Sequence, residues 1–168
     1  MYSKLKVKPI DKKYDAIFIG SDKGRFSIIR DIYELCKDKA RIFISIYQAE
    51  DNSSLKYKDT FQINRSMDYK EVIRYSLSSN CLIDIVADKQ SGLSLRAMEA
   101  IVYNKKLLTN NPAIKNFPYY NEKYMKLLND ISDTNVDFLI KDELVEYNYG
   151  GEYSPCQFIK NVEQKLKR

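Results

Sequence analysis

The stretch of residues 80–111 constrains most strongly what this chain can fold into. Residues 81–86 are a short apolar run, which is typical of a strand covered on both faces. A turn containing Gly92 follows, and Ser94 is a suitable N-cap for a helix that begins at Leu95. Four apolar residues recur at helical spacing and are expected to face the sheet: Leu95, Met98, Ile101 and Val102.

The second half of this stretch predicts the end of the helix and another strand. Asn104 tolerates the left-handed backbone conformation at which helices commonly end, and residues 106–109 then form the strand. Such a unit directs the start of its helix to the carboxyl edge of a parallel sheet, where free N–H groups and the helix dipole attract phosphate. Asp84 is a charge within the first strand that a purely apolar core does not explain.

The amino-terminal part of the chain follows the same order of elements. Residues 15–20 predict a strand ending in glycine, residues 26–37 an amphipathic helix, and residues 40–47 a strand rich in β-branched and aromatic side chains. This order favours right-handed crossovers and a parallel sheet. We therefore predict an α/β fold, a single Rossmann-like domain with a mainly parallel sheet and helices on both faces, over residues 14–168. Residues 1–13, rich in lysine, are predicted to be a leader or an edge segment.

Two further helices are predicted from their first residues. Asp68 can cap a helix over residues 69–78, and Pro155 suits the first position of a helix that runs to about Lys167. The apolar residues expected to face inward from this last helix are Phe158, Ile159, Val162 and Leu166. Shorter elements are expected at residues 60–63 and 124–128, both as strands, and at residues 138–140, as an edge strand or the start of a helix.

The absence of histidine removes several classes of chemistry. Ser-His-Asp and Cys-His catalysis, histidine zinc sites and a histidine general base are all excluded. The three cysteines are far apart and odd in number, which indicates reduced, structural thiols. No metal and no cofactor are expected.

The net charge of +5 fits either a mildly basic surface or an anionic ligand. The basic residues and the fourteen tyrosines are dispersed, without a helix-turn-helix pattern or an RNP-like strand, so no nucleic-acid partner is expected. No apolar run approaches the roughly 20 residues that a membrane helix needs, so no transmembrane segment is expected. A cytoplasmic location follows as the default, with a peripheral position at the inner membrane face as the alternative.

Two features are candidates for binding phosphate or ribose. The turn from Gly20 to Gly24 is a candidate phosphate loop, although it matches neither common glycine-rich motif, and it is equally a tight turn with glycines for backbone reasons. Glu99 lies one turn into the predicted helix. It is either a half-exposed carboxylate stabilised by the helix dipole or an acceptor of hydrogen bonds from two ribose hydroxyls, as in dinucleotide sites.

Residues 96–109, Arg-Ala-Met-Glu-Ala-Ile-Val-Tyr-Asn-Lys-Lys-Leu-Leu-Thr, resemble the donor-site segment of GT-B glycosyltransferases. The family motif reads approximately E-x7-E-A-x-A-x-G-K-P-V-I-A, and its second glutamate, which binds the nucleotide ribose, falls on Glu99. Ser91 stands at the position of the first glutamate, and Asn104 at that of the helix-ending glycine. Residues 84–109 also resemble a bacterial group of transferases in lipopolysaccharide and capsular-polysaccharide biosynthesis.

The resemblance implies a nucleotide-sugar-binding domain, similar to the C-terminal half of a GT-B enzyme. The implied contacts are Glu99 to the ribose and the segment of Gly92, Leu93, Ser94 and Leu95 to the diphosphate. Residues 18–25 resemble the first strand and loop of the same domain, so Lys23, Gly24 and Arg25 are implied as further phosphate contacts. Arg96 is implied as an additional charge beside the diphosphate. No catalytic residue is implied, because in this family the general base usually comes from the other domain.

The resemblance also implies partners. A nucleoside-diphosphate sugar is the expected ligand, and the lack of histidine, Glu99 and the Lys105-Lys106 pair together favour it. Transfer would need an acceptor-binding domain, supplied in trans or as a missing N-terminal domain. One alternative is a non-catalytic nucleotide-binding partner or scaffold module. Another is a domain without a ligand, in which Glu99 is only a helix carboxylate.

Overall fold

A single parallel sheet organises the structure, a computed structural model that describes residues 11–49, 56–87, 90 and 92–166. Six strands lie in the order β3-β2-β1-β4-β5-β6, and every pair of neighbours is parallel. This is the strand order of Rossmann-like folds, so the predicted fold class is confirmed. The strands are β1 (Tyr14–Ser21), β2 (Ile42–Tyr47), β3 (Gln62–Ile63), β4 (Ser79–Asp84), β5 (Lys106–Thr109) and β6 (Met125–Leu127).

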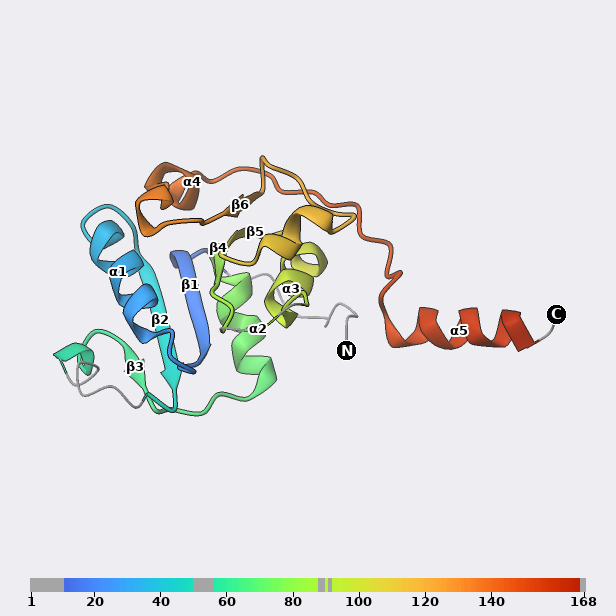
Figure 1. Ribbon diagram of the computed structural model, residues 1–168, viewed down its shortest axis with the longest axis horizontal. Helices are drawn as coiled ribbons and strands as arrows, with labels where there is room; N and C mark the ends of the chain where they lie inside the picture. The colour runs from blue at the N-terminus through green and yellow to red at the C-terminus, as the bar shows by residue number, and fades with distance from the viewer. Residues whose placement is uncertain (1–10, 50–55, 88–89, 91, 167–168) are drawn as a thin grey trace.

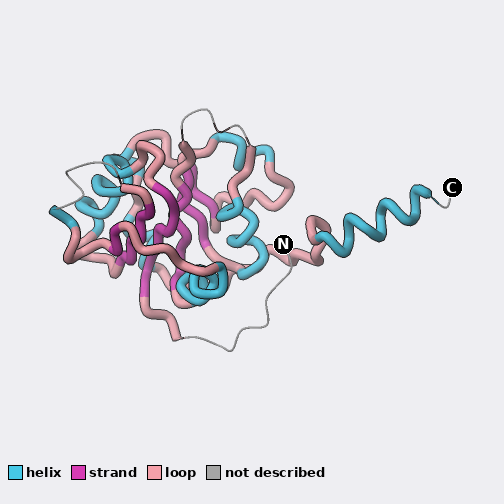
Figure 2. Tube along the Cα trace, turned by 90° about the horizontal axis from the view of Figure 1, so that it is seen from below, coloured by secondary structure: helices cyan, strands magenta, loops and turns pink. Residues whose placement is uncertain are grey.

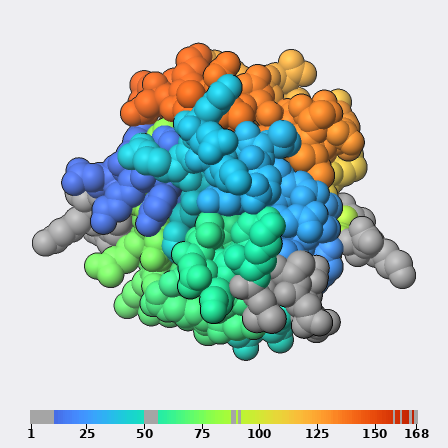
Figure 3. Space-filling view, turned by 90° about the vertical axis from the view of Figure 1, so that its left-hand side faces the viewer, coloured from blue at the N-terminus to red at the C-terminus, as the bar shows by residue number. Residues whose placement is uncertain are grey.

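Helices cover both faces of this sheet (Figures 1 and 2). On one face, α1 (Phe26–Cys36) lies between α4 (Val136–Ile140) and the residues around β3, as Figure 3 shows in blue, orange and green. The opposite face is covered by α2 and α3. The described helices are α1 (Phe26–Cys36), α2 (Tyr69–Leu77), α3 (Leu95–Tyr103), α4 (Val136–Ile140) and α5 (Pro155–Leu166), with 3₁₀ helices at Pro112–Asn116 and Ile131–Asp133.

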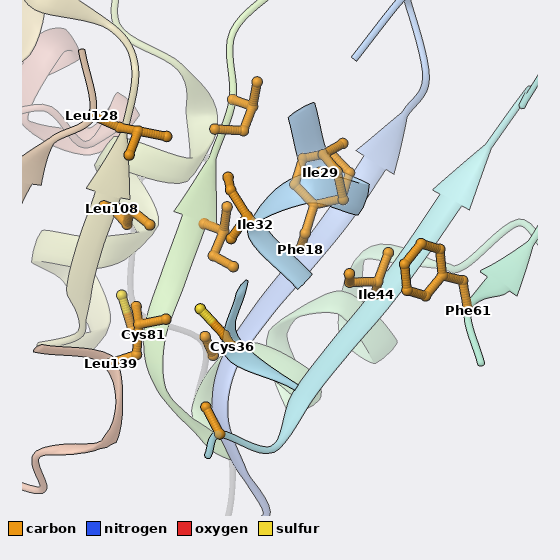
Figure 4. Close-up of a cluster of buried hydrophobic side chains, with 14 of the residues drawn as sticks. Phe18, Ile29, Ile32, Cys36, Ile44, Phe61, Cys81, Leu108, Leu128 and Leu139 are labelled. Atoms are coloured by element: carbon orange, nitrogen blue, oxygen red, sulfur yellow. The ribbon is translucent and has the colours of Figure 1, made fainter. Parts of the chain in front are cut away.

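Two hydrophobic clusters fill the space between the sheet and its helices. Figure 4 shows the cluster beneath α1, where side chains from four strands meet Ile29, Ile32 and Cys36 of α1 and Leu139 of α4. On the other face, a row of paired residues crosses five strands at the same level: Phe43, Ile17, Leu82, Leu107 and Met125. Ile101 of α3 and Ile73 of α2 pack against this row. Because both faces are buried, the strands are continuous apolar runs, as the sequence predicts.

Local capping signals determine where the helices begin and end. The side chain of Asp68 accepts a hydrogen bond from Glu71 N, and the side chain of Ser94 accepts one from Ala97 N. Asn104 ends α3 in the left-handed conformation, with φ of 52°. These three predictions are confirmed, because each depends on residues within one turn of the helix end.

Two predictions about side-chain direction are wrong. Leu95 is 40% exposed, because the first residue of α3 lies beyond the end of the strands rather than over them. In α5, the side chains of Ile159, Val162 and Leu166 are exposed. This helix extends away from the sheet, and none of the other described helices or strands lies over it (Figures 1 and 2). The side chain of Phe158 lies outside the part of the chain that the structure describes.

The shorter elements and the chain start complete the comparison. The strands expected near residues 60–63 and 124–128 form as β3 and β6, and residues 138–140 belong to helix α4 rather than to a strand. Most of the predicted leader, residues 1–10, and Ser91 lie outside the described residues. None of the described helices has the length and apolar character needed to cross a bilayer.

Candidate functional site

A pocket of about 260 Å³ lies at the carboxyl edge of the sheet, where the strands end. The last residues of β1 and β2, the loop before α2, and the first turns of α2 and α3 line it. Strands β2 and β3, which follow β1 in the sequence, lie on one side of it, and β4, β5 and β6 lie on the other. The direction in which successive strands are added to the sheet therefore reverses beside β1. Ligands of open α/β sheets bind at such switch points.

Glu99 is the only acidic residue among the described residues that line this pocket. The residue is only 3% exposed, so the half-exposed carboxylate that periodicity favours is not what the structure shows. Arg96 donates a hydrogen bond to Oε2, whereas Oε1 is buried and has no hydrogen-bond partner among the described residues. Burial raises the pKa of Glu99, and the charge of Arg96 and a hydrogen bond from the Tyr69 hydroxyl to the carboxyl group oppose this shift. The pocket wall therefore carries a buried carboxylate oxygen that can still accept a hydrogen bond.

Arg96 is held in place by three elements of the fold. Its Nη2 donates to the carbonyl oxygen of Ile19 at the end of β1, at 3.0 Å. Its Nη1 donates to Ser76 Oγ of α2, at 3.2 Å, and to Glu99 within α3. The Arg96 side chain is only 12% exposed. It therefore fixes the orientation of Glu99 and adds positive charge beside the pocket.

Two partly exposed tyrosines flank the pocket. Tyr47 ends β2 and is 44% exposed, and Tyr69 begins α2 and is 39% exposed. Burial raises the pKa of Tyr69 to about 12, and the negative charge of Glu99 contributes to this shift. The Tyr69 hydroxyl therefore stays protonated at neutral pH and can donate a hydrogen bond to a carboxylate or a ligand.

The segment before α3 lies beside this pocket. Gly92, Leu93 and Leu95 are exposed, and Leu95 and Arg96 line the pocket directly. The Ser94 hydroxyl accepts the hydrogen bond from Ala97 N at 3.0 Å, which leaves the N–H groups of Leu95 and Arg96 at the helix start without partners inside the helix. The structure thus brings the predicted ribose residue and the predicted diphosphate segment together.

The loop after β1 is organised differently from the phosphate loop that the sequence predicts. Asp22, only 4% exposed, accepts hydrogen bonds from Arg25 N and Phe26 N, both at 2.9 Å, so a carboxylate already caps α1. The guanidinium of Arg25 donates to the carbonyl oxygens of Ser21, Asp22 and Ile85. Lys23 and Gly24 are exposed, both with positive φ. Of the predicted loop from Gly20 to Gly24, only Gly20 and Ser21, the last residues of β1, line the pocket.

The Lys105-Lys106 pair lies at the amino end of β5, at the edge of the sheet opposite the pocket. Lys105 Nζ donates to the carbonyl oxygens of Leu77 and Ser79, at 2.8 and 2.6 Å. Lys106 Nζ donates to the carbonyl oxygens of Phe138 and Lys141. Both ammonium groups bind the protein's own backbone at this edge, so the pair gives no support to a nucleoside diphosphate beside Glu99.

Several pocket residues were not identified from the sequence. They are Ser45 and Tyr47 at the end of β2, Arg65 and Met67 before α2, and Tyr69. The signal for the first two was available, because the carboxyl ends of parallel strands meet at one edge. The loop before α2 carries no motif, and only the topology places it there.

Comparison with known proteins identifies no family for this chain. No protein-family model matches it, and no curated protein matches its sequence. Its function must therefore follow from the fold and the pocket.

Proposed function

We propose that the chain binds a nucleoside-diphosphate sugar, as the donor-binding domain of a glycosyltransferase in bacterial surface-polysaccharide biosynthesis. One observation carries the binding proposal: Oε1 of Glu99 is buried at the wall of the pocket and has no partner among the described residues. A buried acceptor without a partner costs about 1–3 kcal/mol, and a ligand that donates to it removes this cost. The transferase role rests on the resemblance of residues 96–109 to the GT-B donor site.

The ribose is the part of the ligand that Glu99 binds. Vicinal hydroxyls donate hydrogen bonds to a carboxylate, and this is how acidic residues hold ribose in dinucleotide sites. Burial raises the pKa of Glu99, and the charge of Arg96 opposes this shift and so favours the carboxylate form. The rings of Tyr47 and Tyr69 offer apolar faces beside it.

The diphosphate lies at the start of α3. The N–H groups of Leu95 and Arg96 and the positive end of the helix dipole favour anions there. Glu99 is one turn further along the same helix, so ribose and diphosphate contacts come from a single rigid element. In transfer, the same groups stabilise the departing nucleoside diphosphate.

A non-catalytic nucleotide-binding module is the second candidate. The scarcity of carboxylates in the pocket favours it, because Glu99 is the only one among the described lining residues and is paired with Arg96. The described lining residues therefore offer no second carboxylate to deprotonate an acceptor. In the transferase proposal, an acceptor-binding domain supplies that base.

A thermal-shift panel tests the binding proposal. UDP, GDP, CMP and dTDP sugars are added at millimolar concentration to wild type, Glu99→Gln and the exposed control Glu122→Gln. A ligand at about 100 times its Kd stabilises the native state by about 2.7 kcal/mol, so at least one sugar nucleotide is expected to raise the Tm of wild type and control. The rise should be much smaller for Glu99→Gln. No shift of wild type with any of them would overturn the proposal, and equal shifts in all three proteins would remove Glu99 from it.

The transferase role needs its own measurement. Purified acceptor-binding domains encoded beside this chain are mixed with it, the active sugar nucleotide and a lipid-linked or polysaccharide acceptor. Release of nucleoside diphosphate that depends on both proteins supports transfer. Nucleotide binding without release in any such mixture supports the non-catalytic module instead.

A further inference from the structure

Asp84 is a buried carboxylate that does not line the pocket but contacts the segment that does. It ends β4, is 7% exposed, and is paired across the sheet with Thr109 of β5. Thr109 Oγ1 donates to Asp84 Oδ2 at 3.0 Å, and the Ser94 hydroxyl also hydrogen bonds to Asp84. An apolar residue would fill this position at lower cost, since burying a carboxylate requires compensating hydrogen bonds.

The hydroxyls of Ser94 and Thr109 each accept a second hydrogen bond, from a backbone N–H group. Ser94 Oγ accepts from Ala97 N at 3.0 Å and so caps α3. Thr109 Oγ1 accepts from Asn111 N at 3.1 Å. Asn111 Nδ2 then donates to the carbonyl oxygen of Gly92 at 3.0 Å. Gly92 and Ser94 are thus held at two points, and both connections pass through the hydroxyls bound to Asp84.

The hydrogen-bond pattern also determines the direction of these hydroxyls. A hydroxyl has one proton to donate. Burial raises the pKa of Asp84, whereas the hydrogen bonds from Ser94 and Thr109 lower it, as hydroxyls that donate to a carboxylate do. Because Ser94 donates to Asp84, its lone pairs are directed to the amide of Ala97. Asp84 therefore orients the cap from which the first turn of α3 projects into the pocket.

We infer that Asp84 is a positioning residue for diphosphate binding. It fixes residues 92–94 so that the N–H groups at the start of α3 meet the diphosphate of the ligand. This role rests on the proposed function. Glu99, which binds the ribose, is oriented by Arg96 and not by these two hydroxyls. Asp84 acts on Glu99 only through its charge, which adds to the effect of burial in raising the pKa of Glu99. Loss of Asp84 should therefore weaken the diphosphate contact much more than the ribose contact.

The test compares two ligands on the same protein. Isothermal titration measures Kd for the nucleoside diphosphate that gives the largest thermal shift and Kd for its nucleoside without phosphate. In Asp84→Asn, the nucleoside diphosphate is expected to bind about tenfold more weakly, whereas nucleoside binding changes much less. The exposed control Asp38→Asn should keep both values. A merely structural role would weaken both ligands equally, and that result would overturn the inference.

Two further variants keep the inference testable if Asp84→Asn does not fold. Thr109→Val removes one hydroxyl without changing shape, and Ser94→Ala removes the other. Each should lower the preference for nucleoside diphosphate over nucleoside, and Ser94→Thr should restore it. An unchanged preference in both overturns the inference and leaves the proposed function standing. Wild type that binds neither ligand overturns both.

Discussion

Arg96 binds one carboxylate oxygen of Glu99, and the other has no partner among the described residues, although Glu99 is only 3% exposed. The two residues are three positions apart on α3, so the helix itself sets the geometry of the pair. A protein selected only for stability would satisfy this oxygen or replace the pair with apolar side chains. The unpaired oxygen is therefore a cost to the ligand-free protein, and that cost can be measured.

Glu99→Gln should leave the ligand-free protein at least as stable as wild type at pH 7. Burial raises the pKa of Glu99 despite Arg96, so the charged form is disfavoured in the native state relative to the unfolded chain. Glutamine has nearly the same shape and no charge. Urea denaturation of both proteins measures the difference, and a loss of more than about 1 kcal/mol in the variant would contradict this expectation.

The same substitution predicts the sign of a pH dependence. Because the pKa is raised on folding, the native state binds more protons than the unfolded chain between the raised pKa and the ordinary value of 4.5. As the pH falls through this window, wild type should gain stability relative to Glu99→Gln. Denaturation at several pH values above 4.5 follows the difference between the two proteins, and a change of opposite sign is incompatible with a raised pKa.

Asp22→Ala is expected to destabilise the domain by about 1–2 kcal/mol. The Asp22 carboxylate accepts hydrogen bonds from Arg25 N and Phe26 N, and the substitution leaves both N–H groups at the start of α1 without this acceptor. Ser27→Ala, at an exposed position of the same turn, is the matched control and should change little. Urea midpoints compare the variants, and equal midpoints for Asp22→Ala and wild type would show that Asp22 is not the cap.

How much of the fold is predictable from the sequence depends on the distance between the residues involved. The caps at Asp68 and Ser94 and the end of α3 at Asn104 follow from a few neighbouring residues. The parallel direction of the strands follows from the alternation of strands and helices, whereas their order in the sheet does not. The exposed face of α5 did not follow, because helical spacing indicates an apolar stripe but not what covers it.

The candidate site also contains features that depend on neighbouring residues and features that depend on residues far apart in the sequence. Glu99 and the start of α3 lie on one continuous segment, so a sequence motif can indicate both. The contact of Arg25 with the carbonyl oxygen of Ile85 joins residues 60 positions apart, and that of Lys106 with Lys141 joins residues 35 positions apart. Because of such contacts, basic residues that the sequence suggests as phosphate ligands bind backbone carbonyl oxygens of the protein instead. Only the packed topology distinguishes the two roles.

Apolar residues of α5 should contribute little to stability. Ile159 and Leu166 are 56% and 81% exposed, so replacing either with serine removes almost no buried surface. Ile101→Ala in α3, at a residue 1% exposed, should cost about 2–5 kcal/mol. Thermal denaturation compares the three variants. A large loss in Leu166→Ser would mean that α5 packs against the protein in solution.

Lys105→Met should remove a rise in stability that wild type shows in mildly alkaline solution. Burial lowers the pKa of Lys105 from 10.5 to about 8, and repulsion by Lys12 adds to the shift. Between these two values the unfolded chain binds more protons than the native state, so the free energy of unfolding increases with pH there. Below about pH 8 the cost of the buried charge is fully present. Urea denaturation from pH 7 to 10 measures the slope for wild type, Lys105→Met and the exposed control Lys39→Met. Parallel slopes for all three would mean that Lys105 keeps an ordinary pKa, because its hydrogen bonds to Leu77 and Ser79 offset its burial.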